Sequence, residues 1–184
     1  GEKRAYPVLF HGLQKIGFRG YDSLGVATVH DNEFTINKYA GRLHEFKKLN
    51  ADTIFPGNIG LAHTRWATHG MATNENAHPH VSHSGRFALV HKGIVENYAG
   101  LKEKLIKEGF EFTSETDSEV LLNWIEFIFK ERNKSVLEAL QIALNQIVGA
   151  YAIILVDKEE NALYAVRKGA QLVIGVGEND AEYF

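Results

Sequence analysis

The densest group of chemically capable side chains lies in one stretch, from Leu61 to His80. Arg65 and Trp66 stand in its first part, where an apolar pattern that begins at Ile59 and is typical of a buried strand gives way to a polar loop. Small-molecule sites tend to form where a rigid strand meets an exposed loop. This stretch is therefore the first candidate for a ligand site.

Arg65 and Trp66 each have two interpretations. The guanidinium of Arg65 can bind a substrate carboxylate through two parallel hydrogen bonds, or it can form an ion pair at the protein surface. The indole of Trp66 is either a lid over a ligand or a packed aromatic side chain. The residue types alone leave both pairs of alternatives open.

Histidines are frequent around this stretch, which raises the question of a metal site. They are His63, His69, His78, His80, His83 and His91. A zinc site needs several well-spaced ligands, and the chain contains neither a His-Glu-x-x-His pattern nor a cysteine. We therefore predict no metal and no cofactor, and we interpret these histidines as hydrogen-bonded side chains.

A second junction between strand and loop follows at Lys92 and Gly93. The apolar pattern from Arg86 to His91 predicts a strand that stops before these two residues. The backbone N–H of Gly93 can face a developing oxyanion, or the glycine can simply permit a turn.

Asp117 directly follows Ser114-Glu115-Thr116 at the start of a predicted helix, where Ser114 or Thr116 can act as the cap. A carboxylate is favoured at that position even without a catalytic role.

Hydrophobic periodicity predicts helices and strands that occur in blocks. The predicted helices are Ala5–Ile16, Leu43–Leu49, Asn97–Lys107, a run that includes Val120–Ile128, and Ser135–Ile147. The predicted strands are Gly25–His30, Phe34–Tyr39, Ile59–His63, Arg86–His91, Tyr151–Val156, Ala162–Val166 and Leu172–Val176, with a hairpin turn at Asp31 and Asn32. Connections of hairpin length favour antiparallel pairing. We therefore predict an antiparallel α+β layered architecture and not a doubly wound parallel sheet.

Composition narrows the range of partners. The chain has 184 residues, is 45% hydrophobic and carries a formal net charge of -3, which is typical of one globular domain over residues 1–184. Its basic residues are scattered, so we expect neither nucleic acid nor an anionic membrane as a partner. Apolar runs such as Ala150–Val156 are too short to span a bilayer, and we expect a cytoplasmic location.

Four motifs together carry a resemblance to a known family. They are Arg19-Gly20-Tyr21-Asp22-Ser23, His63-Thr64-Arg65-Trp66-Ala67-Thr68-His69-Gly70, Asn76-Ala77-His78-Pro79-His80 and Ser114-Glu115-Thr116-Asp117. In this order they resemble the class II glutamine amidotransferase domain of glucosamine-6-phosphate synthases. The resemblance covers nearly the whole chain and implies the N-terminal-nucleophile fold, a four-layer αββα sandwich of two antiparallel sheets between helical layers.

The resemblance also implies an activity and its partners. The family hydrolyses L-glutamine to L-glutamate and passes ammonia to a downstream sugar-isomerase domain, which makes glucosamine 6-phosphate from fructose 6-phosphate. No sugar-isomerase domain is present in these residues, and we expect the full-length enzyme to form a homo-oligomer through that domain.

Site residues follow from the same motifs. Arg65 resembles the residue that binds the glutamine α-carboxylate, and Asp117 resembles the partner of the α-amino group. One fixed cation and one fixed anion together recognise an amino acid, since it presents opposite charges at one carbon. The remaining residues implied by the resemblance are Thr68 and His69 beside the carboxylate, Trp66 at the tip of the loop that closes over glutamine, His78 near the pocket and Arg19 as support for the nucleophile.

Two departures from the family bear on activity. The family's nucleophile is a cysteine that heads a short strand before the residues resembling Gly1 onward, and the family has an asparagine of the oxyanion hole where Lys92 stands before Gly93. We therefore expect these residues by themselves, without that strand, not to hydrolyse glutamine. The alternative function is a catalytically dead module for glutamine sensing or subunit contact. A metal-binding protein is a more distant alternative.

Overall fold

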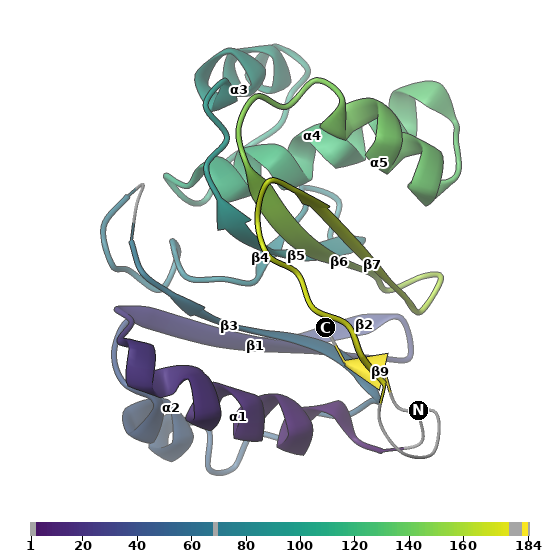
Figure 1. Cartoon of the computed structure of the whole chain (residues 1–184). Helices are drawn as coiled ribbons and strands as arrows, with labels where there is room; N and C mark the ends of the chain where they lie inside the picture. Colours follow the sequence, from purple (N-terminus) through teal and green to yellow (C-terminus); the bar gives the residue numbers. More distant parts are fainter. Residues whose placement is uncertain (1–2, 68–69, 177–181, 184) are drawn as a thin grey trace.

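The computed structural model describes residues 3–67, 70–176 and 182–183 (Figure 1). Its helical elements are α1 (Ala5–Ile16), the 3-10 turn η1 (Gly17–Arg19), α2 (Leu43–Leu49), α3 (Tyr98–Lys107), α4 (Asp117–Arg132) and α5 (Val136–Leu144). Its strands are β1 (Ser23–His30), β2 (Glu33–Tyr39), β3 (Ile59–Arg65), β4 (His80–Val81), β5 (Phe87–Gly93), β6 (Tyr151–Asp157), β7 (Ala162–Lys168), β8 (Gly175–Val176) and β9 (Glu182–Tyr183).

The strands form two principal antiparallel sheets. One has the order β2-β1-β3 and the other has the order β4-β5-β6-β7, while β8 and β9 form a short separate pair. The hairpin between β1 and β2 turns at Asp31 and Asn32, which both have positive φ angles of 49° and 59°. A two-residue turn of this kind matches the twist of antiparallel strands. The predicted hairpin and antiparallel pairing are therefore confirmed.

Three clusters of buried apolar side chains hold the layers together. The first lies between the β1–β3 sheet and the helices α1 and α2, and includes Leu13, Leu24 and Phe46. The second lies between the two sheets and consists of Val29, Leu61, Ala88, Val90 and Val156. The third and largest joins β5 and β6 to α3, α4 and α5.

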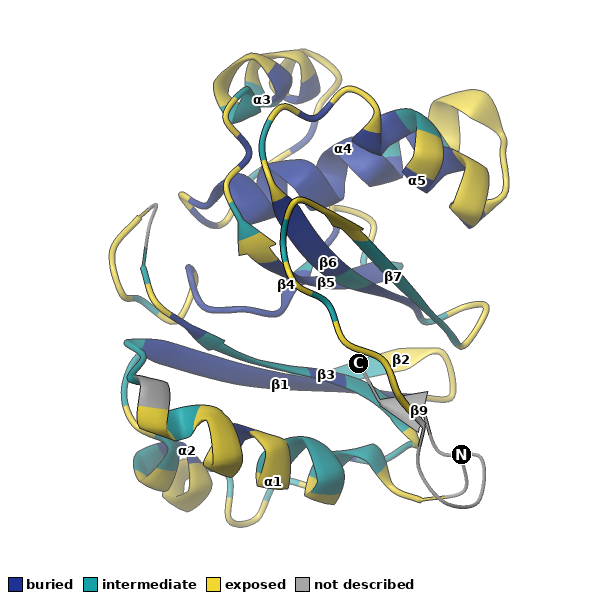
Figure 2. Cartoon of the chain, viewed as in Figure 1, coloured by how far each residue is buried: buried dark blue, intermediate teal, exposed yellow. Residues whose placement is uncertain are grey.

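These clusters produce a sandwich of four layers. Helices α1 and α2 cover one sheet and helices α3 to α5 cover the other, with the two sheets face to face between them (Figure 1). Helix α4 is buried along most of its length, whereas α3 and α5 have one buried and one exposed side. The central strands β1, β5 and β6 are also buried throughout most of their length (Figure 2). The predicted αββα sandwich is confirmed, because each sheet needs one apolar face for its helices and another for the opposite sheet.

The boundaries of some elements differ from the prediction. Strand β5 continues through Lys92 and Gly93, which pair with Ala152 and Tyr151 of β6. The predicted strand Leu172–Val176 is wrong over its first part, since only Gly175–Val176 pair with another strand among the described residues. An apolar sequence pattern does not show whether a neighbouring strand lies beside it. The presence or absence of that neighbour decides where β5 and β8 begin and end.

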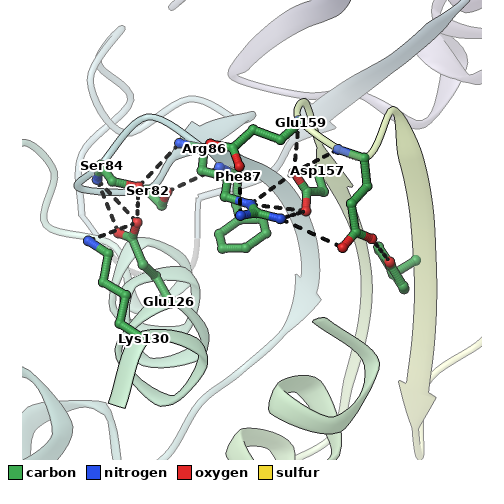
Figure 3. Close-up of polar contacts among 10 residues, drawn as sticks. Ser82, Ser84, Arg86, Phe87, Glu126, Lys130, Asp157 and Glu159 are labelled. Carbon is green, nitrogen blue, oxygen red and sulfur yellow. Dashed lines mark hydrogen bonds and ion pairs between the residues drawn. The ribbon is translucent and has the colours of Figure 1, made fainter. Parts of the chain in front are cut away.

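Two buried carboxylates fix the turn before β5 to its neighbours (Figure 3). The carboxylate of Glu126 in α4 accepts hydrogen bonds from the backbone N–H and the hydroxyl of Ser84. Arg86 donates to Asp157 at the end of β6, with 2.6 Å between Nη2 and Oδ2, and its guanidinium lies 4.6 Å from the ring centre of Phe129. Buried carboxylates need such partners to offset their lost hydration, so this turn is held firmly against α4 and β6.

Within the described residues, no helix is both long enough and apolar enough to cross a membrane.

Candidate active site

A cavity of about 630 Å³ lies where β3, β5 and α4 meet. Six of the residues proposed from the sequence line it: Arg65, Trp66, His78, Lys92, Gly93 and Asp117. They come from the end of β3, the end of β5, the first turn of α4 and the connection before β4. The fold therefore brings together side chains that lie far apart in the sequence.

Arg65 is the last residue of β3 and its side chain is almost entirely buried. Its guanidinium donates hydrogen bonds to the carbonyl oxygens of Gly70 and Met71, at 3.2 and 3.1 Å. It also lies 3.8 Å from the carboxylate of Asp22. Arg65 therefore does have an ion-pair partner, but the alternative of a pair at the surface is wrong, because the guanidinium is buried at the cavity wall.

Asp117 opens helix α4 without capping it. Thr116 is the cap, and its hydroxyl accepts a hydrogen bond from the backbone N–H of Glu119. The carboxylate of Asp117 instead accepts the backbone N–H of Val95 at 2.8 Å and the hydroxyl of Ser118 at 3.4 Å. These contacts tie the start of α4 to the loop after β5 and hold a buried negative charge beside the cavity.

Three histidines, His63, His78 and His91, line the cavity, and the ring of His80 lies beside that of His78, with 4.8 Å between ring centres. Only some of their ring nitrogens are hydrogen-bonded. His80 pairs with the Thr116 hydroxyl at 3.0 Å, and Nδ1 of His91 pairs with the Ser118 hydroxyl at 2.9 Å. In the described part of the chain, neither ring nitrogen of His78 has a hydrogen-bond partner. The interpretation of these histidines as hydrogen-bonded side chains therefore holds for His80 and His91 and is wrong for His78.

The environment keeps these histidines neutral. Burial lowers the pKa of His63 to about 3, and the nearby cations Arg65 and Lys92 also lower it. Burial also lowers the pKa of His78 and of His80 well below the usual value. The described residues contain no group of three or more His, Cys, Asp or Glu side chains that could hold a metal ion.

Trp66 lies at the mouth of the cavity. Its side chain is 72% exposed, so the alternative of a packed aromatic residue is wrong. Its ring approaches Gly20, where an added Cβ would lie 3.2 Å from Cζ3 of the indole.

Three predicted site residues cannot be placed by their side chains. The backbone of Arg19 ends the turn just before Gly20, but its side chain lies outside the described part of the structure. Thr68 and His69 lie outside the described residues altogether.

Gly93 has a structural requirement of its own. Its φ angle is 144°, and a Cβ added there would lie 2.1 Å from the carbonyl oxygen of Ala150. The residue continues the β5 ladder, so the alternative of a simple turn is wrong. Only glycine permits so close an approach of the two chains. Its neighbour Lys92 is exposed and lines the same cavity.

Several lining residues were not assigned to the substrate site from the sequence. They are Gly20, Thr64 and Ser118, together with His63 and His91, which were considered only as metal ligands or hydrogen-bonded histidines, and Thr116, which was considered only as a helix cap. Strand alternation offers one signal for His63, since it precedes Arg65 by two residues on β3 and therefore shares a face with it. No local pattern predicts that Ser118 belongs to the site, because its hydrogen bond is to His91 of another element.

Comparison with known proteins gives consistent results. Residues 63–173 match the model of the family described as the glutamine amidotransferase domain. The chain is 46% identical over 182 residues to a glutamine--fructose-6-phosphate aminotransferase [isomerizing] of Bacteroides thetaiotaomicron, covering 98% of this chain and 30% of that protein. It is 45% identical over 186 residues to the protein of the same name from Clostridium tetani, covering 100% of this chain and 30% of that protein. The chain thus spans about 30% of the length of these curated relatives.

Solved structures agree with the sequence relatives. The glutamine phosphoribosylpyrophosphate amidotransferase of B. subtilis, complexed with ADP and GMP, superimposes with a TM-score of 0.73 at 25% identity, over 86% of this chain and 34% of that one. The structural neighbour and the confirmed sandwich point to the same fold, and the family match covers more than half of the chain. The chain therefore belongs to the glutamine amidotransferase domain family.

Proposed function

We propose that the cavity binds L-glutamine by its α-amino acid group, with Arg65 facing the carboxylate and Asp117 facing the ammonium group. The observation that carries the proposal is that a buried guanidinium and a buried carboxylate line one cavity from different elements. A free amino acid carries those two opposite charges at one carbon. A fixed cation and a fixed anion therefore select this class of ligand over a simple acid or amine.

The reaction we propose for the domain is hydrolysis of the glutamine side-chain amide. A thiolate attacks the amide carbon, the resulting oxyanion needs nearby donors, and ammonia leaves as a thioester forms. Water then cleaves the thioester, so that glutamine and water become glutamate and ammonia. The backbone N–H of Gly93 and the ammonium of Lys92 are the proposed oxyanion donors. The 184 residues contain no cysteine, so the nucleophile is not among them.

The remaining assignments follow the resemblance. We propose that Trp66 closes over bound glutamine, that His78, Thr68 and His69 complete the substrate site, and that Arg19 supports the nucleophile. The names of the relatives support the proposal that the ammonia aminates fructose 6-phosphate in a longer enzyme. In that enzyme we propose a downstream sugar-isomerase domain, through which the subunits form a homo-oligomer.

Calorimetric titration of the chain with altered ligands tests the proposed orientation without altering the protein. L-glutamine should bind, whereas L-glutaminamide, which lacks the α-carboxylate, and N-acetyl-L-glutamine, which lacks the α-ammonium group, should each bind at least about tenfold more weakly. D117N should lose affinity for L-glutamine to a similar degree. Equal affinities for the three ligands, or no binding of L-glutamine, would overturn the proposal.

The proposed hydrolysis needs a separate test, because a glutamine-sensing module would show the same binding. The full-length product of the gene should release ammonia from L-glutamine, and D117N should lower that rate. A full-length protein that binds glutamine and releases no ammonia would exclude hydrolysis and support the sensing function.

A further inference from the structure

Three charged side chains line the cavity: Arg65, Lys92 and Asp117. Arg65 already has a carboxylate close by, since Asp22 lies 3.8 Å from its guanidinium. Lys92 is the lining cation to which the described residues give no ion pair. A ligand whose own charges cancel, as those of glutamine do, leaves this ammonium group without an anionic partner.

The ammonium group of Lys92 is the charge that a ligand in the cavity can compensate. Within the described ranges, no carboxylate forms an ion pair with its ammonium group, whereas Arg65 has Asp22 nearby. Its place on β5 is fixed by pairing with Ala152. Lys92, Arg65 and His63 line the same cavity.

The amino acid orientation proposed above decides which part of the ligand is left for Lys92. If Arg65 and Asp117 hold the two charges at the α-carbon, the end of the side chain is the remaining polar group. In glutamine this end is a neutral amide, and in glutamate it is a carboxylate. An ammonium group forms a stronger, charge-assisted hydrogen bond with the carboxylate.

We propose that the cavity binds L-glutamate more tightly than L-glutamine, through an ion pair between Lys92 and the γ-carboxylate. This inference rests on the proposed function, because it uses the same orientation of the ligand. It makes Lys92 the residue that determines specificity between the two ligands. Glutamate, the product of glutamine hydrolysis, is then retained in the site and competes with the next glutamine.

Calorimetric titration with both ligands tests the preference. The unaltered chain should bind L-glutamate about fivefold more tightly than L-glutamine, a modest ratio because Lys92 is exposed and its ion pair is weakened by water. In K92M and in K92Q the ratio should fall to about one, chiefly through weaker binding of glutamate. Added salt should lower the ratio of the unaltered chain, since mobile ions screen an exposed pair.

K107N is the matched control. Lys107 is an exposed lysine at the end of α3, outside the residues that line the cavity. The variant changes the net charge as K92M does and should keep the preference for glutamate. If K107N lowered the ratio as much as K92M, the preference would come from overall charge and the inference would be wrong.

The outcomes separate this inference from the function on which it rests. If both ligands bind with equal affinity, or if K92M and K92Q keep the wild-type ratio, the specificity inference fails and the proposed function stands. If neither ligand binds, or if D117N leaves the affinity for both unchanged, the proposed function itself fails.

Discussion

At the residue scale, the neutral histidines beside the cavity link stability to pH. Burial lowers the pKa of His63, His78 and His80 in the folded chain below the ordinary histidine value of about 6.5. Below that pH the unfolded chain takes up protons that the folded chain does not. The stability that these rings contribute is therefore fully present above about pH 6.5 and is lost as the pH falls toward the lowered folded pKa values.

Chemical denaturation at several pH values between 7.5 and 5 should show this dependence. Each histidine that stays neutral on folding contributes a slope of at most about 1.4 kcal/mol per pH unit. H78Q should lose the share of one histidine and give a shallower slope than the unaltered chain. H11Q, which replaces an exposed histidine of α1, is the matched control. Carboxylates also make stability depend on pH, but they do so equally in H78Q and in the unaltered chain. Equal slopes of the two proteins would therefore contradict the role given to His78.

At the element scale, the start of α4 matters more than an ordinary helix cap. The Thr116 hydroxyl accepts the backbone N–H of Glu119, and it also pairs with His80 and with Ser114. These contacts orient the helix that carries Asp117. The cap of α5, Ser135, has a reciprocal capping box but lies at the surface. The two caps therefore allow a matched comparison between a buried network and an exposed one.

Replacing each cap by alanine should separate the two contributions. S135A should lower the free energy of unfolding by about 1 kcal/mol, as is usual for an exposed cap. T116A should lower it by about 2 to 3 kcal/mol, because it also leaves buried polar groups without their partner. T116A should in addition weaken glutamine binding, which S135A should not. Equal losses of stability from denaturation curves would show that the buried network adds nothing.

At the scale of the whole molecule, the cluster between the sheets makes the two halves one unit. Leu61 from β3 and Val156 from β6 meet in that cluster, although they come from different sheets. Each sheet also has its own helices on its outer face. Removing side-chain volume between the sheets should therefore weaken the whole sandwich and not one half.

L61A should lower the free energy of unfolding by about 2 to 4 kcal/mol, through lost burial and the cavity left behind. Fluorescence and circular dichroism should still report one shared transition. L137A is the control, because Leu137 of α5 is 55% exposed, and it should change stability by about 0.5 kcal/mol or less. Two separate transitions in L61A would show that the sheets unfold independently.

Much of the fold could be predicted from local sequence. Helices Ala5–Ile16 and Leu43–Leu49 have the predicted bounds, and the hairpin turns at Asp31 and Asn32 as expected. These features depend on residues that are neighbours in the chain. Side chains three or four positions apart share a helix face, and alternate residues share a strand face. The antiparallel layered architecture follows from the short connections between such elements.

The candidate site could be predicted only in part. Motif resemblance selected Arg65 and Asp117, and the structure adds that both are buried beside one cavity. The sequence alone did not decide whether Trp66 is exposed, and it did not predict that His78 lacks hydrogen-bond partners among the described residues. Exposure and hydrogen bonding depend on atoms from distant segments, which no local pattern specifies.

The sequence by itself determined the helices, most of the longer strands, the family and the two residues expected to hold an amino acid. Only the tertiary structure decided that β5 continues through Gly93, because Tyr151 lies opposite it on β6. Only the tertiary structure brought the ends of β3 and β5 to the first turn of α4 around one cavity. The physical reason is that local patterns encode which face of an element is apolar, whereas the cavity depends on how three elements from distant parts of the chain pack together.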